Sequence, residues 1–258
     1  MRAYACGTPI RGPLIGAAAE SVGVPLILEG KPVYQGGDAI IWGCIRGAPE
    51  LMKEVRKRGH DFWQMDNAYR GRNSYFRITK NAFQHVGLEQ SSPDRWEVIA
   101  KRFGLEIKPW TKGKHIVIAL STEHLYRLHG LELKPWLEQT VKTIKKHSDR
   151  EIVVREKNAT GPIEDFIKNA HALVTYTSMA ALDALQMGVP VFCDEKCAVA
   201  PMAQQDLSRI ESPVYPDDRE RLFWTLADHQ FTKEELKEGL WKKYSSVTTN
   251  EKQLLTTS

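Results

Sequence analysis

The chain has 258 residues, of which 42% are hydrophobic and 26% are charged, and its formal net charge is +4. This composition is typical of a soluble globular protein, and no apolar run approaches the roughly 18 residues that a membrane-spanning helix needs. The first residues lack the apolar core of a signal peptide, so we expect a cytoplasmic protein. The mild basic excess permits a polyanionic partner without requiring one.

Four cysteines are scattered along the chain: Cys6, Cys44, Cys193 and Cys197. Cysteines that are few and scattered favour reduced thiols over a disulfide framework. Cys193 and Cys197 have a spacing that suits a pair of metal ligands, but no second close pair of cysteines or histidines lies near them in the sequence. We therefore expect no bound metal.

The first hundred residues alternate apolar runs with amphipathic segments, which predicts a parallel sheet covered by helices. The predicted strands are residues 2–7, 24–30, 38–44 and 60–66. The predicted helices are residues 12–23, 48–59 and 92–104, the last with Ser92 before Pro93 at its first position. Residues 67–87 are basic and aromatic and have no clean period.

A proline and three lysines interrupt this pattern at residues 105–115, which predicts a boundary between domains 1–110 and 111–258. The alternation then begins again, with predicted strands at residues 115–120, 150–156, 171–177 and 189–194. The predicted helices are residues 133–147, 163–170 and 178–187. Residues 217–244 are predicted to be helical, with a capping box from Thr232 to Glu235, and a polar tail follows. Two such sheets predict an α/β protein with two Rossmann-like domains facing across a cleft.

The segment TYTSMAALDALQMGVPVF, residues 175–192, turns from a strand directly into a helix. Such a turn directs backbone N–H groups and the positive end of the helix dipole at an anion. The hydroxyls of Thr177 and Ser178 either cap the helix or bind a phosphate. Both interpretations remain open from the residues alone.

This segment resembles the donor-site helix of the GT-B glycosyltransferases. In that family the turn holds the nucleotide diphosphate, and an acidic residue five positions before the glycine of Gly-x-Pro binds the ribose. The resemblance places Ser178 at the phosphate position and Asp183 at the ribose position, where the family usually has glutamate. It implies a nucleotide-sugar donor of the UDP type as co-substrate, with no tightly bound cofactor and no required divalent metal. A solvated helix residue is the alternative for Asp183.

Two further strand ends of the second half carry candidate donor-binding residues. Arg155 and Lys157 come directly after a strand, where cations neutralise the charge on a departing diphosphate. Ser121, Glu123 and His124 follow the first strand, and this stretch resembles the first donor-domain strand and its loop. Solvated strand ends and a helix cap remain the alternatives.

Asp66 ends a strand of the first half and is the predicted general base, because a carboxylate there can take the proton of an acceptor hydroxyl. Asp38 and Glu29 are other candidates, and a simple turn at Asp66 is the alternative. Basic and aromatic residues that suit nucleic acid follow Asp66, and two more arginines extend the basic rim. These predicted acceptor-binding residues are Arg11, Arg46, Arg70, Arg72, Tyr75, Arg77 and Lys80. A surface loop with its aromatic rings in the core explains the segment equally well.

The succession MDNAYRGR…YFRITKNAFQ, LSTEHLYRLHG…REIVVREK and LADHQFTKEELKEGLW resembles a group of phage-encoded glycosyltransferases. The resemblance implies an inverting hexosyltransferase that moves a sugar to the hydroxymethyl group of a 5-hydroxymethylcytosine-like base in phage DNA. It places residues 1–110 with the acceptor and 111–258 with the donor, in the cytoplasm of an infected bacterium. Glycosyltransferases of surface polysaccharide or glycolipid synthesis and sugar-nucleotide epimerases share the residue 175–192 pattern. A non-catalytic nucleic-acid-binding protein is the alternative of another class, and nothing in the sequence predicts the oligomeric state.

Overall fold

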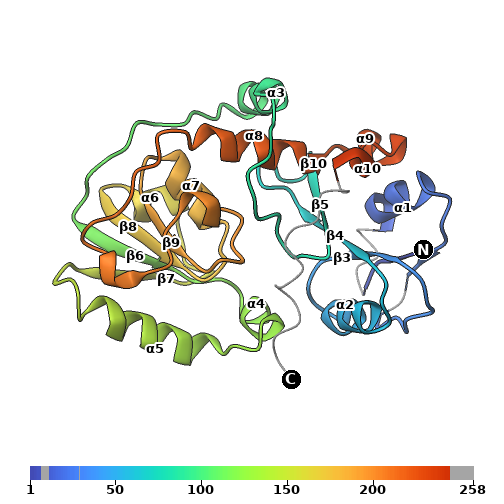
Figure 1. The fold of residues 1–258 in the computed structure, drawn as a ribbon, viewed down its shortest axis with the longest axis horizontal. Helices are drawn as coiled ribbons and strands as arrows, with labels where there is room; N and C mark the ends of the chain where they lie inside the picture. The colour runs from blue at the N-terminus through green and yellow to red at the C-terminus, as the bar shows by residue number, and fades with distance from the viewer. Residues whose placement is uncertain (7–11, 29, 245–258) are drawn as a thin grey trace. The chain divides into compact units, whose positions relative to one another are not determined.

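The computed structural model describes residues 1–6, 12–28 and 30–244 and shows a mixed α/β protein with two separate sheets (Figure 1). By its internal contacts the chain divides into a first unit, Met1–His85 with Leu226–Ser258, and a second unit, Val86–Thr225. The predicted α/β class is confirmed, whereas two Rossmann-like domains facing across a cleft stay a prediction. No helix of the described residues is both long and apolar enough to cross a membrane.

The first unit has a six-stranded sheet in the order β10-β5-β4-β3-β1-β2. The strands are β1 (Arg2–Tyr4), β2 (Leu26–Ile27), β3 (Ala39–Trp42), β4 (Phe62–Asn67), β5 (Phe76–Lys80) and β10 (Gln230–Phe231). Strands β2, β1, β3 and β4 are parallel, and β5 and β10 are antiparallel additions at the β4 edge. The sequence predicted the four parallel strands but missed β5 and β10. Strand β5 lies where no period was visible, and β10 interrupts the stretch of residues 217–244 that was wrongly predicted to be helical throughout.

Helices cover both faces of this sheet. They are α1 (Gly12–Glu20), α2 (Ala48–Lys57), α9 (Lys233–Glu238) and α10 (Trp241–Tyr244). Buried side chains of α1, α9 and α10 share one core with Met65 and Phe231, and α2 packs on the opposite face against Ile41. The predicted capping box is confirmed, because the Thr232 hydroxyl accepts from the Glu235 amide and the Glu235 carboxylate accepts from the Thr232 amide.

The second unit has a four-stranded parallel sheet in the order β7-β6-β8-β9. Its strands are β6 (His115–Ala119), β7 (Ile152–Arg155), β8 (Ala170–Thr175) and β9 (Val191–Cys193). Its helices are α3 (Asp94–Phe103), α4 (Glu123–Leu128), α5 (Leu133–Ile144), α6 (Ile163–Ile167), α7 (Ala180–Gln186) and α8 (Glu220–Asp228), with short 3₁₀ turns η2 (Ala200–Met202) and η3 (Leu207–Arg209). The sequence predicted each of these except α4 and the 3₁₀ turns, and α8 contains the boundary between the units.

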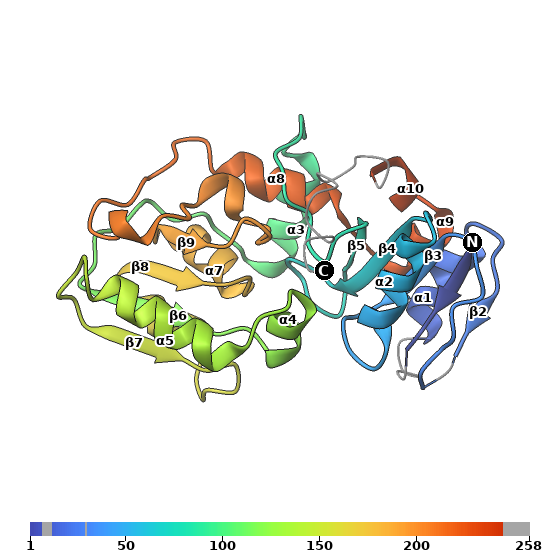
Figure 2. The same ribbon diagram turned by 60° about the horizontal axis from the view of Figure 1, so that its bottom comes forward.

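The connections of this sheet reverse direction at β6. The chain passes from β6 to β7 on one side and then returns to β8 on the other side (Figure 2). Helix α5 and turn η3 share a core with one face of the sheet, and α6 and α7 contact β8 and lie across the other face. Loops that leave such a reversal point diverge, and in open α/β sheets ligands bind at the carboxyl ends of the strands there.

The compact units differ from the predicted domains 1–110 and 111–258. Residues 86–110 group with the second sheet, and the chain from residue 226 onward returns to the first sheet through β10. This return depends on a pairing between residues far apart in the chain, Gln230 with Arg77 and Phe231 with Phe76. The acceptor and donor roles of the two segments stay predictions.

Candidate functional site

The carboxyl edge of the second unit's sheet gathers predicted donor-binding residues from three strands. Ser121 follows β6, Arg155 ends β7, and Thr177 and Ser178 follow β8. The parallel register pairs Ala119 with Arg155, so the strand ends are level and their side chains alternate in step. The structure therefore brings these segments together at the edge where open α/β sheets bind ligands.

Some buried polar atoms at this edge have no hydrogen-bond partner among the described residues, and two of them belong to predicted donor-binding residues. These two are the hydroxyl oxygen of Ser121, whose residue is 2% exposed, and Nε of Arg155. The Arg155 guanidinium lies 5.3 Å from the ring centre of Phe166 in α6. A buried polar atom without a partner costs about 1–3 kcal/mol, and native proteins keep few of them. Their presence at one sheet edge indicates that a polar ligand or water completes the site.

A pocket of about 330 Å³ opens beside the ends of β8 and β9. Its lining includes the aromatic residues Trp136, Tyr176 and Phe192, the acidic residues Asp194 and Glu195, and Gln205, together with threonine, aliphatic and cysteine side chains. Its volume is within the range of small-molecule sites. Aromatic faces bind the flat faces of bases and sugars, and carboxylates accept hydrogen bonds from hydroxyl groups. The pocket therefore suits a nucleoside or a sugar.

The aromatic wall of this pocket belongs to a larger ring cluster at the ends of β6 and β8. Tyr176 stacks on Tyr126 of α4 at 5.3 Å, and Trp136 lies edge-on to Tyr176 at 6.2 Å. Burial raises the pKa of Tyr126 to about 12, and burial together with Asp194 raises the pKa of Tyr176. Both phenols therefore stay protonated at neutral pH.

His129 completes the cluster, with its ring 5.7 Å from that of Tyr176. Burial, and to a smaller extent the cation of Lys196, lowers the pKa of His129 to about 4. The Lys196 ammonium lies 3.5 Å from the Asp194 carboxylate that lines the pocket. At neutral pH the imidazole is neutral, and the charged side chains among the described residues that line the pocket are Asp194, which pairs with Lys196, and Glu195.

The turn after β8 is closely tied to the protein itself. Ser178 is 7% exposed; its amide donates to the Thr175 hydroxyl, and its own hydroxyl accepts from the Ala180 amide at 3.4 Å. The Thr175 hydroxyl in turn donates to the Ala119 carbonyl at 2.6 Å. The Ser178 hydroxyl thus contacts the first amide of α7, a seven-residue helix whose N-cap residue is Met179. Phosphate binding by Ser178 and ribose binding by the half-buried Asp183 stay predictions.

The Gly-x-Pro part of the motif has a packing explanation. Gly188 has a φ of 78°, and a Cβ built there would lie 1.9 Å from the Pro109 carbonyl oxygen. The linker before β6 runs past this point, because the Lys108 amide donates to Gln186 and the Thr111 amide donates to Gly188. Glycine is required at this position because its backbone must adopt a left-handed conformation in contact with another segment.

The remaining predicted donor residues lie on exposed positions. Glu123 and His124 begin α4, and Glu123 pairs with Arg127 one turn later at 2.8 Å. Lys157 is exposed in the loop after β7. These side chains lie at the same edge of the sheet, but they are not part of the pocket lining.

In the first unit, the predicted base Asp66 lies on β4 opposite Arg77 of β5. Its carboxylate is 19% exposed and lies 3.4 Å from the Arg77 guanidinium, and it also accepts from the Asn67 amide. Arg77 is 4% exposed and lies over the rings of Tyr69 and Phe83, at 5.3 and 4.8 Å. The guanidinium therefore orients the carboxylate from inside the protein.

The other predicted acceptor residues do not form one basic surface. Arg72 and Arg46 are exposed, whereas Tyr75 is buried and Arg70 is partly buried. The Lys80 ammonium lies 2.8 Å from Asp61 and over the ring of Trp63. Tyr75 and Arg77 are thus buried within the protein, as in the alternative interpretation of this segment.

Three residues considered at the sequence level need separate mention. Arg11 and Glu29 lie outside the described residues. Asp38, the other candidate base, accepts from the Asp61 amide and lies 3.8 Å from His60. Its role as a base stays untested.

No protein-family model matches this sequence, and no curated protein matches it. Several solved structures match it, and two of them do so along most of their length. The chain shares its fold with two KpsC domains. They are the Thermosulfurimonas dismutans KpsC β-Kdo 2,4-transferase and 2,7-transferase, with TM-scores of 0.52 and 0.54 and identities of 11% and 12%. The matches cover 90% and 94% of this chain and 92% and 99% of the KpsC chains. At such low identity the likeness shows the fold alone.

Sequence reasoning missed most of the pocket lining. Asp194 ends a predicted strand, which is the same signal that selected Arg155, so it was available in the sequence. Trp136 and Gln205 carry no such signal, because α5 and the segment after β9 reach the pocket only through tertiary packing.

Proposed function

We propose that this protein is a glycosyltransferase that uses a nucleotide sugar to build a surface polysaccharide or glycolipid. The observation that carries the proposal is the pocket with aromatic and carboxylate lining at the carboxyl ends of β8 and β9. The shared fold with two transferases named for Kdo transfer supports the same class of reaction. A saccharide that contains Kdo or another acidic sugar is accordingly the first product to test.

In this proposal the pocket binds the nucleoside of the donor. The base stacks on Trp136 or Tyr176, and the ribose hydroxyls donate to Asp194 or Glu195. The carboxylates repel phosphate groups, so the phosphate lies outside the pocket. Ser121 after β6 and Arg155 at the end of β7 are the proposed phosphate ligands along the sheet edge, and both have a buried atom that a ligand would satisfy.

Asp66 remains the proposed general base. In a single displacement with inversion, the acceptor oxygen bonds to the anomeric carbon as the nucleotide leaves, and the hydroxyl proton passes to the Asp66 carboxylate. Arg77 supports this role by holding the carboxylate in one orientation, since it is buried and stacked on two rings. No metal enters the proposed step.

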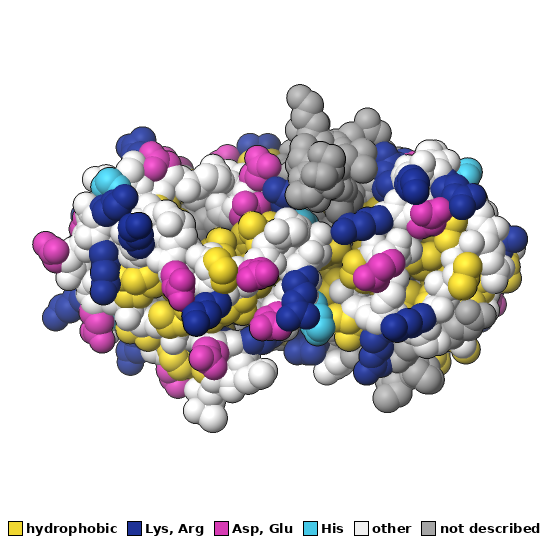
Figure 3. Space-filling view, turned by 90° about the horizontal axis from the view of Figure 1, so that it is seen from below, with side chains coloured by type: hydrophobic (Ala, Val, Ile, Leu, Met, Phe, Trp, Pro, Cys, Tyr) yellow, Lys and Arg dark blue, Asp and Glu magenta, His cyan; other side chains and the backbone are white. Residues whose placement is uncertain are grey.

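Hydroxymethylated DNA is the less favoured acceptor. Tyr75 and Arg77, which were expected to contact nucleic acid, are buried, and Lys80 is paired with Asp61. On the face of the molecule drawn in Figure 3, basic and acidic side chains are interspersed, without a continuous basic stripe. Nucleic-acid binding depends on such a concentration of cations.

Nucleotide binding tests the proposal first. Titration calorimetry with CMP, UDP and GDP should identify one nucleotide that binds and raises the melting temperature, because it binds only the native state. Asp194→Asn should weaken that nucleotide about tenfold, the loss of one charge-assisted hydrogen bond. Asp149→Asn, an exposed carboxylate of the same unit, is the matched control. If none of the three nucleotides binds, the proposal fails.

Transfer is tested next with a panel of nucleotide sugars, oligosaccharide acceptors and hydroxymethylcytosine DNA. Mass spectrometry of the acceptors should show a sugar added to an oligosaccharide. Transfer of a sugar to the DNA instead would favour viral DNA modification as the function of this protein.

A further inference from the structure

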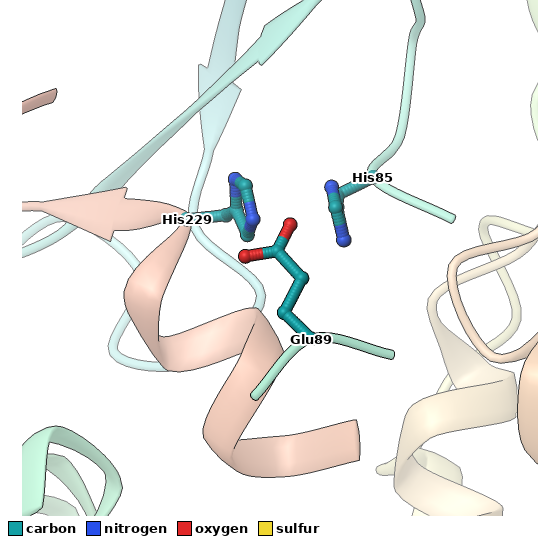
Figure 4. Close-up of side chains that lie close together, drawn as sticks. All are labelled: His85, Glu89 and His229. Carbon is teal, nitrogen blue, oxygen red and sulfur yellow. The ribbon is translucent and has the colours of Figure 1, made fainter. Parts of the chain in front are cut away.

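Two buried histidines of the first unit lie ring against ring (Figure 4). The ring centres of His85 and His229 are 3.7 Å apart, with an angle of 17° between the ring planes. Each residue is 2% exposed. The sequence does not single out either histidine. His85 ends the first chain segment of this unit, and His229 lies near the start of the second segment, which begins at Leu226. Their proximity arises only when β10 pairs with β5.

The backbone holds both histidines in place. The His85 amide donates to the Tyr69 phenol oxygen at 2.8 Å, and the same Tyr69 ring lies under the Arg77 guanidinium. The His229 carbonyl accepts from the Ile78 amide of β5, one residue before β10 begins. These bonds fix the backbone positions from which the two imidazoles extend.

The His85 imidazole is in the form that coordinates metals. Burial, and to a smaller extent the neighbouring His229, lowers the pKa of His85 well below its usual range, so the ring is neutral at neutral pH. A neutral imidazole offers one ring nitrogen lone pair to a metal ion. A ring nitrogen of His85 lies within 4.8 Å of one of His229. In tetrahedral zinc sites, with Zn–N distances near 2.0–2.1 Å, two such nitrogens lie about 3.4 Å apart. Because the two rings are stacked, their in-plane lone pairs run side by side, so both side chains must rotate out of the stack for one ion to lie in the plane of each ring.

We propose that His85 and His229 form a binding site for a divalent transition-metal ion. Imidazole ligands favour zinc, copper and nickel over magnesium and calcium. The ion would tie β10 to the segment after β5 and so fasten the returning end of the chain to the first sheet. Glu89, also drawn in Figure 4, belongs to the second unit, and the proposal does not depend on it. The site is independent of the proposed transfer reaction, which needs no metal.

Metal binding is tested on the full chain after removal of metals with a chelator. Zn²⁺ titrated by calorimetry should bind at one equivalent and raise the melting temperature, and Co²⁺ should give a visible absorption spectrum of a nitrogen-ligated ion. His85→Gln and His229→Gln should each lower the Zn²⁺ affinity by at least about tenfold. His147→Gln, which removes an exposed histidine of the second unit, should leave the affinity unchanged.

A second measurement covers the case in which the buried variants do not fold. Wild-type protein labelled with ¹⁵N-histidine should show shifted ring-nitrogen resonances for two histidines on addition of Zn²⁺. The proposal is overturned if Zn²⁺ moves no histidine resonance, or if the folded His85→Gln variant binds Zn²⁺ as tightly as the wild type. In that outcome the pair is a stacked core contact.

Discussion

At the scale of residues, the ion pair between Asp66 and Arg77 combines a structural and a proposed catalytic role. Arg77 is almost completely buried, whereas the Asp66 carboxylate is partly exposed. Removing the carboxylate leaves a buried cation without its partner, so Asp66→Ala should lower the free energy of unfolding by about 3 kcal/mol. Urea denaturation measures this change. The double variant Asp66→Ala/Arg77→Met should recover part of it, and strict additivity of the two single variants would contradict the coupling.

The catalytic part of that role has a separate test. Asp66→Asn keeps the size of the side chain and a carbonyl oxygen for Arg77, but the amide cannot accept the acceptor's proton. Transfer should fall at least about a hundredfold while the dissociation constant of the nucleotide stays within a factor of two. Unchanged turnover would remove Asp66 from the mechanism.

His129 gives stability a dependence on pH. Its pKa is lowered from 6.5 to about 4 by burial, so the unfolded chain binds the proton more tightly than the folded protein. The free energy of unfolding therefore carries no penalty from His129 above about pH 6.5, and it falls by about 3 kcal/mol in all as the pH drops toward 4. His129→Gln should therefore reduce the stability difference between pH 7 and pH 5, measured by urea denaturation at both values. An equal difference in wild type and variant would show that other groups, His85 among them, carry the pH dependence.

At the scale of elements, the sequence predicted most strands and helices because their periodicity is local. It missed β5 and β10, whose pairing joins residues far apart in the chain. It missed α4 because this helix has only six residues and follows directly on a strand end. The turn between β8 and α7 was located correctly, whereas its donor role stays a prediction, and the pocket next to it depends on Trp136 of α5 and on Gln205, which only packing brings to β8 and β9.

Gly188, the glycine of the Gly-x-Pro segment, packs directly against the backbone of Pro109. Gly188→Ala meets both a left-handed φ, which costs about 1–2 kcal/mol, and the Pro109 carbonyl, whose displacement costs about as much again. We expect a total loss of about 3 kcal/mol in urea denaturation. Gly104→Ala is the matched control, because Gly104 has a φ of 61° with no atom near its would-be Cβ, and it should lose only about 1 kcal/mol. Equal losses at the two positions would show that the contact with Pro109 is not restrictive.

At the scale of the whole molecule, the chain leaves the first unit at residue 85 and returns to it at residue 226. The returning segment contributes Phe231, Leu236 and Trp241, each at most 1% exposed, to a core shared with α1 and β4. The first unit is therefore completed only by the end of the chain, whereas the second unit is one continuous stretch. Sequence reasoning cannot anticipate this, since it assigns a domain boundary from local composition.

Trp241→Ala tests whether the two units have separate stabilities. The indole is 1% exposed, packs edge-on against Trp63 and donates to the Ser21 hydroxyl, so its removal should cost about 3–5 kcal/mol. Hydrogen exchange followed by mass spectrometry should then show faster exchange in β4, whose Met65 shares that core, and unchanged exchange in β6 of the second unit. Leu131→Ala, which truncates an exposed side chain of the second unit, controls for general effects of substitution. Equal acceleration in β4 and β6 would mean that the two units unfold as one, and that the end of the chain stabilises both.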